Sequence, residues 1–512
     1  MVFRILDVLI ATVFAGCLVF WLWAELVFYQ AVRAYIDQDP LHPTAPTLDG
    51  FPRPTKALAR FWLGPAEKKQ GVLSWDEKMA VVRRYRWTEV LFAGLALLVF
   101  LAGLWRFWQG DQGGLLSLSA SSKRQASQPI AAIQLSISRH PLIADFSRTG
   151  RSLPETVDPY SSDPSQVDVR SKDLTSMDLS GRGSVLAFAN FDSKTKWPDK
   201  DKMPPDFKPE TVMETGKNPG LGLASVHAAG ITGKGVGIAI IDQALLVDHA
   251  EYKAELRHYE EIHWPAQYPT ATMHGAAVAS IAVGKTVGVA PDADLYYIAE
   301  QHTSFEPPYD LDFIPLAQSI ERVLQINQTL PKENKIRVIS ISRGWAPTDR
   351  GYAEVTRAVN KAKSQGVFVV SSSVAQTHGL SFHGLGRDPL ASPEKPESYG
   401  PGSWWAKDFY DGRYPNVERG DVLLVPMDSR TTASPTGTED YVFYRSGGWS
   451  WSIPYIAGLY ALACQVDPKV TPDSFWDAAL ATGDTVDIDA GGRVVHMGRV
   501  VNPAALIKRL SK

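Results

Sequence analysis

The chain has 512 residues, of which 45% are hydrophobic and 21% are charged, and its formal net charge at pH 7 is −3. These values are ordinary for a globular protein of two or three folding units, and they exclude wholesale disorder, a collagen-like chain and a disulfide scaffold. Because the net charge is near zero, the protein has no overall basic field, and we expect no nucleic acid among its partners.

Two uncharged apolar runs near the N-terminus predict transmembrane helices. The first extends from Val8 to Ala24 and the second from Val90 to Trp105, and aromatic residues flank both. Each run is near the lower limit of length for a helix that spans a bilayer. We therefore predict spanning helices over about 7–29 and 88–108, which with their connecting segment form a membrane anchor at 1–108. A buried core helix is the alternative for either run.

The distribution of lysine and arginine predicts the orientation of this anchor. The connecting segment carries ten of these residues between Gln30 and Glu89, whereas the six residues before Asp7 carry only Arg4. Positively charged loops stay on the cytoplasmic side of a membrane. We therefore expect the connecting segment in the cytoplasm, and both ends of the chain outside the cell.

Residues 109–220 show few strong periodic runs. Gly, Ser and Gln are frequent from Gln109 to Gln128, which is typical of a linker. The sequence from there to about Gly220 is polar and interrupted by proline. We interpret this region as a linker, a spacer or a pro-segment, and a surface for a partner is a further alternative.

From Leu221 onward, short apolar runs alternate with helical patterns. Four runs have the length and composition of buried strands: 236–242, 294–299, 337–342 and 367–373. Strands that alternate with helices predict an α/β domain at 221–512, with a parallel sheet flanked by helices on both faces. Functional side chains gather at the carboxyl ends of the strands in such sheets.

Three side chains in separate segments have the types needed for nucleophilic catalysis. Asp242 ends the first buried strand, His274 opens an apolar helical run, and Ser450 follows a glycine pair at the start of another. A serine hydroxyl needs an adjacent base, histidine has a suitable pKa, and a buried carboxylate orients the imidazole. Taken singly, such residues are usually a turn acid, a core histidine and a helix cap. Ser446 and Ser452 are rival nucleophiles.

The patterns around these residues resemble those of the subtilisin-like serine proteases, the subtilases. His-Gly-x-x-Val-Ala occurs at 274–279, Gly-Val-Ala-Pro at 288–291, and Gly-x-Ser-x-x-x-Pro-x-x-Ala-Gly at 448–458. The order Asp, His, Ser along the chain is also that of the subtilisins. The resemblance covers roughly 221–505. It implies a subtilisin-like fold and a serine endopeptidase, with the three residues above as orienting acid, general base and nucleophile.

The chain departs from the family pattern around the nucleophile. Trp449 and Trp451 stand where Thr and Met are usual, and no Asn occurs between 361 and 415, where the family has the side-chain donor of its oxyanion hole. A lost donor of that kind lowers turnover by about 100- to 1,000-fold. Ser373 and Gln376 are candidate replacements, beside the amide N–H of the nucleophile. The alternative function is therefore a weak or inactive pseudo-protease that binds extended peptides.

The segment Ser342-Arg343-Gly344 resembles the subtilase strand that pairs with the substrate backbone. An extended peptide that adds to a strand edge gains affinity from main-chain hydrogen bonds. The resemblance implies that Ser342, Arg343 and Gly344 contact the substrate. Gly448 is a further candidate, because a glycine lets substrate and backbone approach closely. Arg343, in place of an apolar residue, suggests a preference for acidic residues, with a solvent-exposed side chain as the alternative.

Metal and cofactor signals are weak. The sequence contains no zinc motif, and we expect no cofactor, although structural calcium is common in the family that the chain resembles. His378 and His383 are interpreted as loop histidines, with metal ligation as the alternative. The expected partners are a polypeptide substrate and the membrane. We predict a two-span protein of the cell membrane with an extracytoplasmic catalytic domain, and the oligomeric state is left open.

Overall fold

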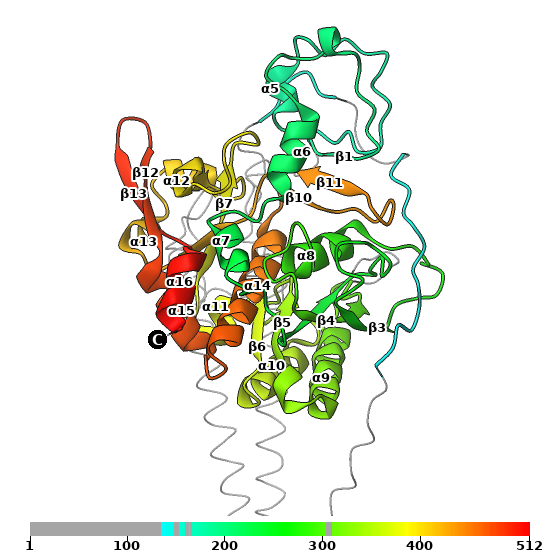
Figure 1. Ribbon diagram of the computed structural model, residues 1–512, viewed down its shortest axis with the longest axis vertical. Coiled ribbons are helices and arrows are strands. Elements are labelled where there is room, and N and C mark those ends of the chain that lie inside the picture. The colour runs from blue at the N-terminus through cyan, green and yellow to red at the C-terminus, as the bar shows by residue number, and fades with distance from the viewer. Residues whose placement is uncertain (1–134, 148–152, 159–162, 164–165, 304–309, 512) are drawn as a thin grey trace, which may run out of the picture. The chain divides into compact units, whose positions relative to one another are not determined.

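The computed structural model describes residues 135–511 except 148–152, 159–162, 164–165 and 304–309 (Figure 1). The chain splits into two compact units, Met1–Pro129 and Ile130–Lys512, and the described residues all belong to the second unit. Both predicted spans and their connecting segment lie outside the described residues. Within the described ranges, no helix has the length and apolar character that crossing a bilayer requires.

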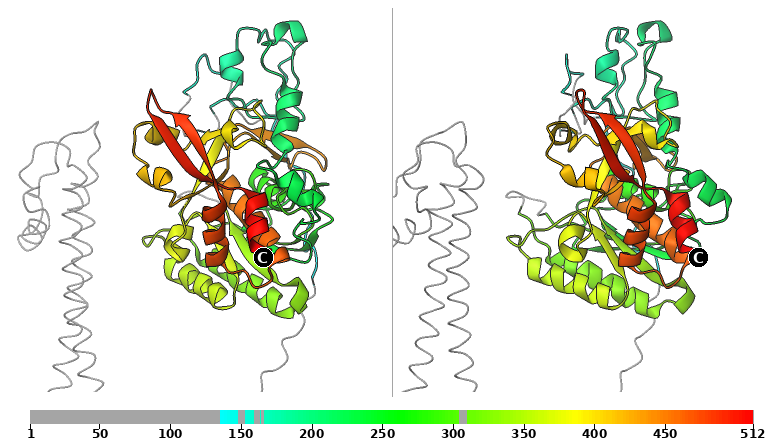
Figure 2. Two further views of the ribbon diagram at one scale, coloured as in Figure 1. Left: turned by 60° about the vertical axis from the view of Figure 1, so that its left-hand side comes forward. Right: turned by 90° about the vertical axis from the view of Figure 1, so that its left-hand side faces the viewer.

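A parallel sheet of five strands forms the centre of the second unit (Figures 1 and 2). Its strands are, in spatial order, β3 (Leu256–Ile262), β4 (Asp294–Glu300), β2 (Gly237–Asp242), β5 (Ile336–Ile341) and β6 (Phe368–Ser371). Every neighbouring pair is parallel. The four apolar runs predicted as buried strands form β2, β4, β5 and β6, so the predicted parallel sheet is confirmed.

Helices cover both faces of this sheet, as predicted. They are α8 (Met273–Val283) and α14 (Trp449–Val466) on one face, and α9 (Ile314–Thr329) and α10 (Tyr352–Ser364) on the other. The residues of β2 alternate between the two sides, because successive side chains of a strand point to opposite faces. Ile238 and Ile240 belong to the hydrophobic cluster of α8 and α14, whereas Ala239 and Ile241 belong to that of α9 and α10.

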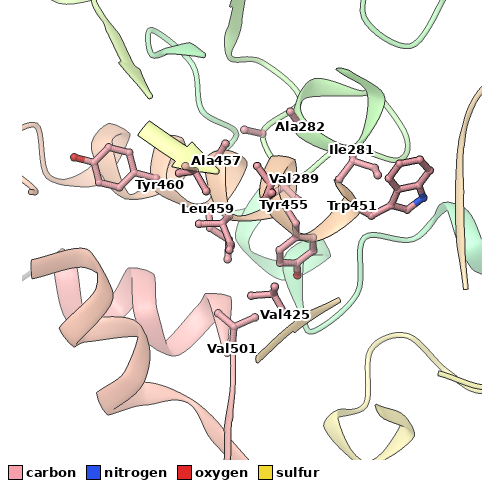
Figure 3. Packing of buried hydrophobic residues seen from close by; sticks show 14 of the residues in the cluster. Ile281, Ala282, Val289, Val425, Trp451, Tyr455, Ala457, Leu459, Tyr460 and Val501 are labelled. Atoms are coloured by element: carbon pink, nitrogen blue, oxygen red, sulfur yellow. The ribbon is translucent and has the colours of Figure 1, made fainter. Parts of the chain in front are cut away.

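The long helix α14 is buried along most of its length. Figure 3 shows Tyr455 and Ala457 of this helix among Ile281, Ala282 and Val289, all members of one cluster. Burial of each large apolar side chain contributes roughly 1.5–3 kcal/mol. This packing fixes the position of the helix whose first turn carries Ser450.

A second, mixed sheet lies beside the central one. Its strands are, in spatial order, β12 (Asp484–Asp489), β13 (Val494–Val500), β9 (Leu423–Pro426), β7 (Phe382–Arg387) and β8 (Tyr399–Pro401). The other elements of this part of the chain are α7 (Leu223–Ala228), η6 (Lys332–Asn334), α11 (Val374–His378), η7 (Pro396–Ser398), α12 (Ala406–Tyr410), α13 (Pro415–Arg419), α15 (Pro472–Thr482) and α16 (Pro503–Leu510).

The segment 166–217 packs against the body through a small third sheet (Figure 1). The sheet has the order β1 (Phe191–Asp192), β11 (Tyr441–Tyr444) and β10 (Arg430–Ala433), and the segment adds α5 (Gly183–Leu186), η5 (Lys200–Lys202) and α6 (Pro209–Lys217). Phe191 packs on Phe443 with ring centroids 5.3 Å apart. The sequence left the role of 109–220 open, and in the structure this part of it is joined to the body by strand pairing and a shared apolar cluster.

Candidate active site

Asp242 and His274 meet at the carboxyl edge of the central sheet. Asp242 is the last residue of β2, and His274 is the second residue of α8, where the side chain of Thr272 caps the helix by accepting the amide hydrogen of Gly275. Nδ1 of His274 lies 2.7 Å from Oδ1 of Asp242. A Cβ at Gly275 would lie 2.6 Å from the carbonyl oxygen of Gln243. Glycine is therefore required there for the helix to approach the strand end this closely.

This contact sets the protonation of the imidazole. An ionised carboxylate only accepts hydrogen bonds, so Nδ1 of His274 carries the proton and Nε2 is left as the basic nitrogen. Burial alone would lower the pKa of His274, but the charge of Asp242 and the hydrogen bond to it outweigh burial and raise that pKa above its ordinary value. The side chains of Asp242 and His274 are 6% and 25% exposed. The carboxylate is therefore shielded, while the imidazole can be reached.

Ser450 lies in the first turn of α14. Gly448 precedes the helix with φ +64°, and a Cβ there would lie 2.9 Å from the ring of Trp404. The hydroxyl of Ser450 donates to the carbonyl oxygen of Ser342 over 3.4 Å, which is a weak contact, and the Ser342 hydroxyl donates to the Ser450 carbonyl over 2.9 Å. Glycine thus admits the turn that presents Ser450, and Ser342 fixes its backbone.

The structure joins two of the three predicted catalytic residues directly and the third through a neighbour. No hydrogen bond links Ser450 to His274 within the described residues. The ring of Trp451 meets that of His274 edge to face, with centroids 5.5 Å apart, so the first turn of α14 lies against the imidazole. The Ser450 hydroxyl itself is turned toward Ser342.

The predicted oxyanion candidates lie in and before α11. Ser373 is 4% exposed, and its hydroxyl accepts the amide hydrogen of Trp345 and donates to the carbonyl oxygen of the same residue. Gln376 is exposed, and its side chain forms no hydrogen bond to the described residues. The amide N–H of Ser450 likewise has no partner among them. The Ser373 hydroxyl thus already holds the loop after β5, whereas the Ser450 amide N–H is not engaged by a described residue.

The predicted substrate segment Ser342–Gly344 follows β5 beside Ser450. The carbonyl oxygen of Arg343 accepts the amide hydrogen of Ser372, which ties the segment to the end of β6. The side chain of Arg343 is exposed and forms no ion pair with a described residue.

The interpretation of His378 and His383 as loop residues is wrong. His378 ends α11 and His383 lies in β7. The His383 ring stacks on Trp405 with centroids 4.8 Å apart, and burial lowers the pKa of each imidazole to about 4. Both side chains are partly buried, and an aromatic ring packs against each of them. No group of three or more side chains suited to a metal occurs among the described residues.

Sequence reasoning missed Asp428, which organises the loop before Ser450. This buried residue follows β9, and its two carboxylate oxygens accept the amide hydrogens of Gly447 over 3.1 Å and Ser403 over 2.7 Å. A sequence pattern that could have indicated Asp428 was present, because this residue follows an apolar run much as Asp242 does. The sequence pattern alone does not distinguish an acid that orients a histidine from one that accepts backbone amide hydrogens of a loop.

Residues 233–400 match the model of the subtilase family, Peptidase S8. The matched range includes Asp242 and His274 and ends before Ser450. Solved structures to which the chain is similar include the prenylagaramide maturation protease PagA, at 16% identity over 57% of this chain and 99% of that chain with a TM-score of 0.39. The PatG macrocyclase in complex with peptide has 17% identity over 57% and 96%, with a TM-score of 0.40. A protease from Pseudoalteromonas arctica has 18% identity over 58% and 95%, with a TM-score of 0.39.

Proposed function

We propose that this protein is a serine endopeptidase that hydrolyses peptide bonds through an acyl-enzyme. Ser450 is the nucleophile, His274 the general base and then the general acid, and Asp242 the orienting carboxylate. The observation that carries this proposal is the 2.7 Å contact between Nδ1 of His274 and Oδ1 of Asp242, because it leaves Nε2 as the basic nitrogen at the rim of the sheet.

The chemistry follows from the positions of these groups. Rotation about χ1 of Ser450 turns its hydroxyl from Ser342 toward His274, and catalytic hydrogen bonds often tighten only when substrate binds. Nε2 of His274 takes the hydroxyl proton as Oγ attacks the scissile carbonyl carbon. The amide N–H of Ser450, at the positive end of α14, donates to the oxyanion. The protonated imidazole then gives its proton to the leaving amine, and water hydrolyses the ester by the same route.

A pseudo-protease that binds extended peptides is the second candidate. Two contacts favour it: the Ser450 hydroxyl donates to Ser342 rather than to His274, and the Ser373 hydroxyl is occupied by Trp345. A protein of this kind would keep the strand edge at Ser342–Gly344 for peptide binding. It would turn over substrate slowly or not at all.

Covalent labelling with a fluorophosphonate separates the two candidates. An activated serine reacts with this probe, so we expect labelling of the wild type and none of Ser450→Ala. Ser452→Ala is the matched control, since that buried hydroxyl only donates weakly to the Pro426 carbonyl oxygen over 3.4 Å. Absence of labelling in the wild type, with peptide binding retained, would favour the pseudo-protease.

We propose that the two apolar runs at about 7–29 and 88–108 anchor the protein in the cell membrane, with the catalytic domain outside the cytoplasm. The lysines and arginines between the runs support this orientation. Protease added to intact cells should remove the C-terminal part, and permeabilised cells provide the control. If the C-terminal part resisted the protease on intact cells but was removed in permeabilised cells, the proposed orientation would be wrong.

The proposed chemistry needs no cofactor. Labelling is therefore expected to survive dialysis against a chelator. A chelator-induced fall in the melting temperature would reveal structural calcium, the alternative suggested by the family resemblance.

A further inference from the structure

A cavity of about 240 Å³ lies beside the segment that leads to the nucleophile. Ser446, four residues before Ser450, lines it together with Ser403, and their hydroxyls are 2.7 Å apart. Asp428 also lines the cavity and accepts the amide hydrogen of Gly447. The cavity wall and the backbone before Ser450 are thus parts of one hydrogen-bonded structure.

Arg387 places one guanidinium in the lining of this cavity. It lies in β7 and is only 4% exposed. Its terminal nitrogens donate to the carbonyl oxygens of residues 388, 389, 391 and 429, which are all neutral acceptors. No carboxylate forms an ion pair with Arg387 within the described part of the chain. Of the nearby acids, Asp388 acts on this guanidinium through its charge but forms no ion pair with it. A buried cation without an ion-pair partner is unfavourable, so the cavity favours an anionic ligand.

Arg445 places a second guanidinium in the same lining, directly after β11. Nε donates to the carbonyl oxygen of Ala187 over 3.2 Å, and Nη1 approaches the hydroxyl of Ser429 over 3.4 Å. Nη2 has no partner among the described residues, and Arg445 forms no ion pair with them. Nη2 of Arg445 is therefore available to donate hydrogen bonds to a ligand.

Three acids share the lining: Asp163, Asp388 and Asp428. Both oxygens of Asp428 accept backbone amide hydrogens, and burial outweighs the charge of Arg445 and raises the pKa of Asp428, which favours its neutral form. Asp388 accepts the amide hydrogen of Leu390 over 2.9 Å. Two of the acids are therefore engaged by backbone amides, and neither guanidinium forms an ion pair with a described residue.

The cavity is separate from the expected site of the substrate strand, because β5, β6 and Ser342–Gly344 contribute nothing to its lining. If the acyl half of a peptide pairs with Ser342–Gly344, the surface at Ser446–Gly448 is left for the leaving half. We propose, on the basis of the function proposed above, that this cavity binds a carboxylate on the C-terminal side of the scissile bond. The carboxylate is either an Asp or Glu side chain or the terminal carboxylate of a short peptide.

Binding of peptide libraries to the Ser450→Ala variant tests this proposal without catalysis. The libraries consist of octapeptides with Asp, Asn or Lys fixed at one position at a time, each made with a free and with an amidated C-terminus. Charge-assisted hydrogen bonds strengthen binding by about tenfold or more, so we expect Asp to be enriched over Asn by about that factor. Preference that persists in amidated peptides identifies a side-chain carboxylate, and preference lost on amidation identifies the terminal one.

Two variants in the same background assign the preference to the cavity. Arg445→Gln should abolish the enrichment, and Arg445→Lys should retain part of it. Tyr410→Glu, at a lining residue that is 41% exposed, should also abolish it, because the new carboxylate competes for the guanidinium groups while every contact of Arg445 is kept. Arg419→Gln, which removes an exposed charge elsewhere, is the matched control and should leave the enrichment unchanged.

Equal binding of Asp and Asn libraries, or enrichment of Lys, would overturn the proposal. An enrichment that survives both Arg445→Gln and Tyr410→Glu would also overturn it. These outcomes are distinct from failure of the peptidase function, which is measured by fluorophosphonate labelling of the wild type. Labelling without carboxylate preference removes only the cavity proposal, and carboxylate preference without labelling removes only the peptidase.

Discussion

On the acid–base side of the candidate site, Asp242 ends a buried strand and His274 lies in the first turn of a capped helix, and the two are 2.7 Å apart. On the nucleophile side, Ser450 stands between two tryptophans, and its hydroxyl donates to Ser342. The first side follows the family pattern and forms its contact without a ligand. The second departs from the pattern, and the proposed mechanism requires a rotation of the Ser450 side chain before its hydroxyl can reach His274. Any loss of activity is therefore expected to originate in the surroundings of Ser450.

The largest effect is expected when the nucleophile is removed. Ser450→Ala should lower kcat by about 10⁵- to 10⁶-fold, since the rest of the triad does not act without the hydroxyl. Steady-state hydrolysis of a fluorogenic peptide measures this, with Ser452→Ala as the control. Equal activity of Ser450→Ala and wild type would show that the nucleophile side has no role in catalysis.

Asp242→Asn tests the acid–base side. The amide disfavours the tautomer that leaves Nε2 basic, so kcat should fall by about 10³- to 10⁴-fold. In the wild type, the pKa of His274 is raised, so kcat/KM should increase with pH through a midpoint above the ordinary histidine value of about 6.5. The residual activity of the variant should show a lower midpoint. An unchanged pH profile would mean that Asp242 does not control the imidazole.

His383→Phe tests the aromatic packing on the nucleophile side. Burial lowers the pKa of His383 to about 4, so between pH 6.5 and pH 4 the unfolded chain binds more protons and folding stability falls as the pH falls. Phenylalanine keeps the stacking on Trp405 and removes this titration. The loss of unfolding free energy on acidification should therefore shrink, by up to about 3 kcal/mol.

Denaturant unfolding at several pH values measures that slope. His496→Phe, at an exposed position of β13, is the matched control. If His496→Phe reduced the pH dependence of the unfolding free energy as much as His383→Phe, this dependence could not be assigned to His383.

The smallest effect on turnover is expected for Ser373→Ala. Its hydroxyl bridges the amide and the carbonyl oxygen of Trp345, so its loss should lower the free energy of unfolding by about 1–3 kcal/mol. Turnover should change less than about threefold, compared with about 100- to 1,000-fold for a lost oxyanion donor. A fall of the larger size with unchanged stability would make Ser373 the missing donor.

The central sheet was predictable because four of its strands are nearly continuous apolar runs. β3 was not, since its sequence includes Arg257, Glu260 and Glu261. These charges are neutralised by residues distant in the sequence, such as Arg322 against Glu260 and Arg139 against Glu261. A strand that relies on remote counter-charges carries little local signal.

The candidate site was predictable to a similar degree. Asp242 and His274 stand on regular elements, and their contact follows from residue type and chain order. The contact of Ser450 with Ser342, the engagement of Ser373 by Trp345 and the position of Trp404 over Gly448 depend on how loops meet in three dimensions. Sequence patterns along one segment do not contain that information.

The pairing of β1 with β11 has a practical consequence for anyone who isolates the subtilase-like region. A fragment beginning at Leu221 would lack β1 and α6 and would leave one edge of β11, and the ring of Phe443, uncovered. Unpaired strand edges recruit other extended chains. Such a fragment should self-associate in solution, whereas one that begins near Gln166 should stay monodisperse at the same concentration.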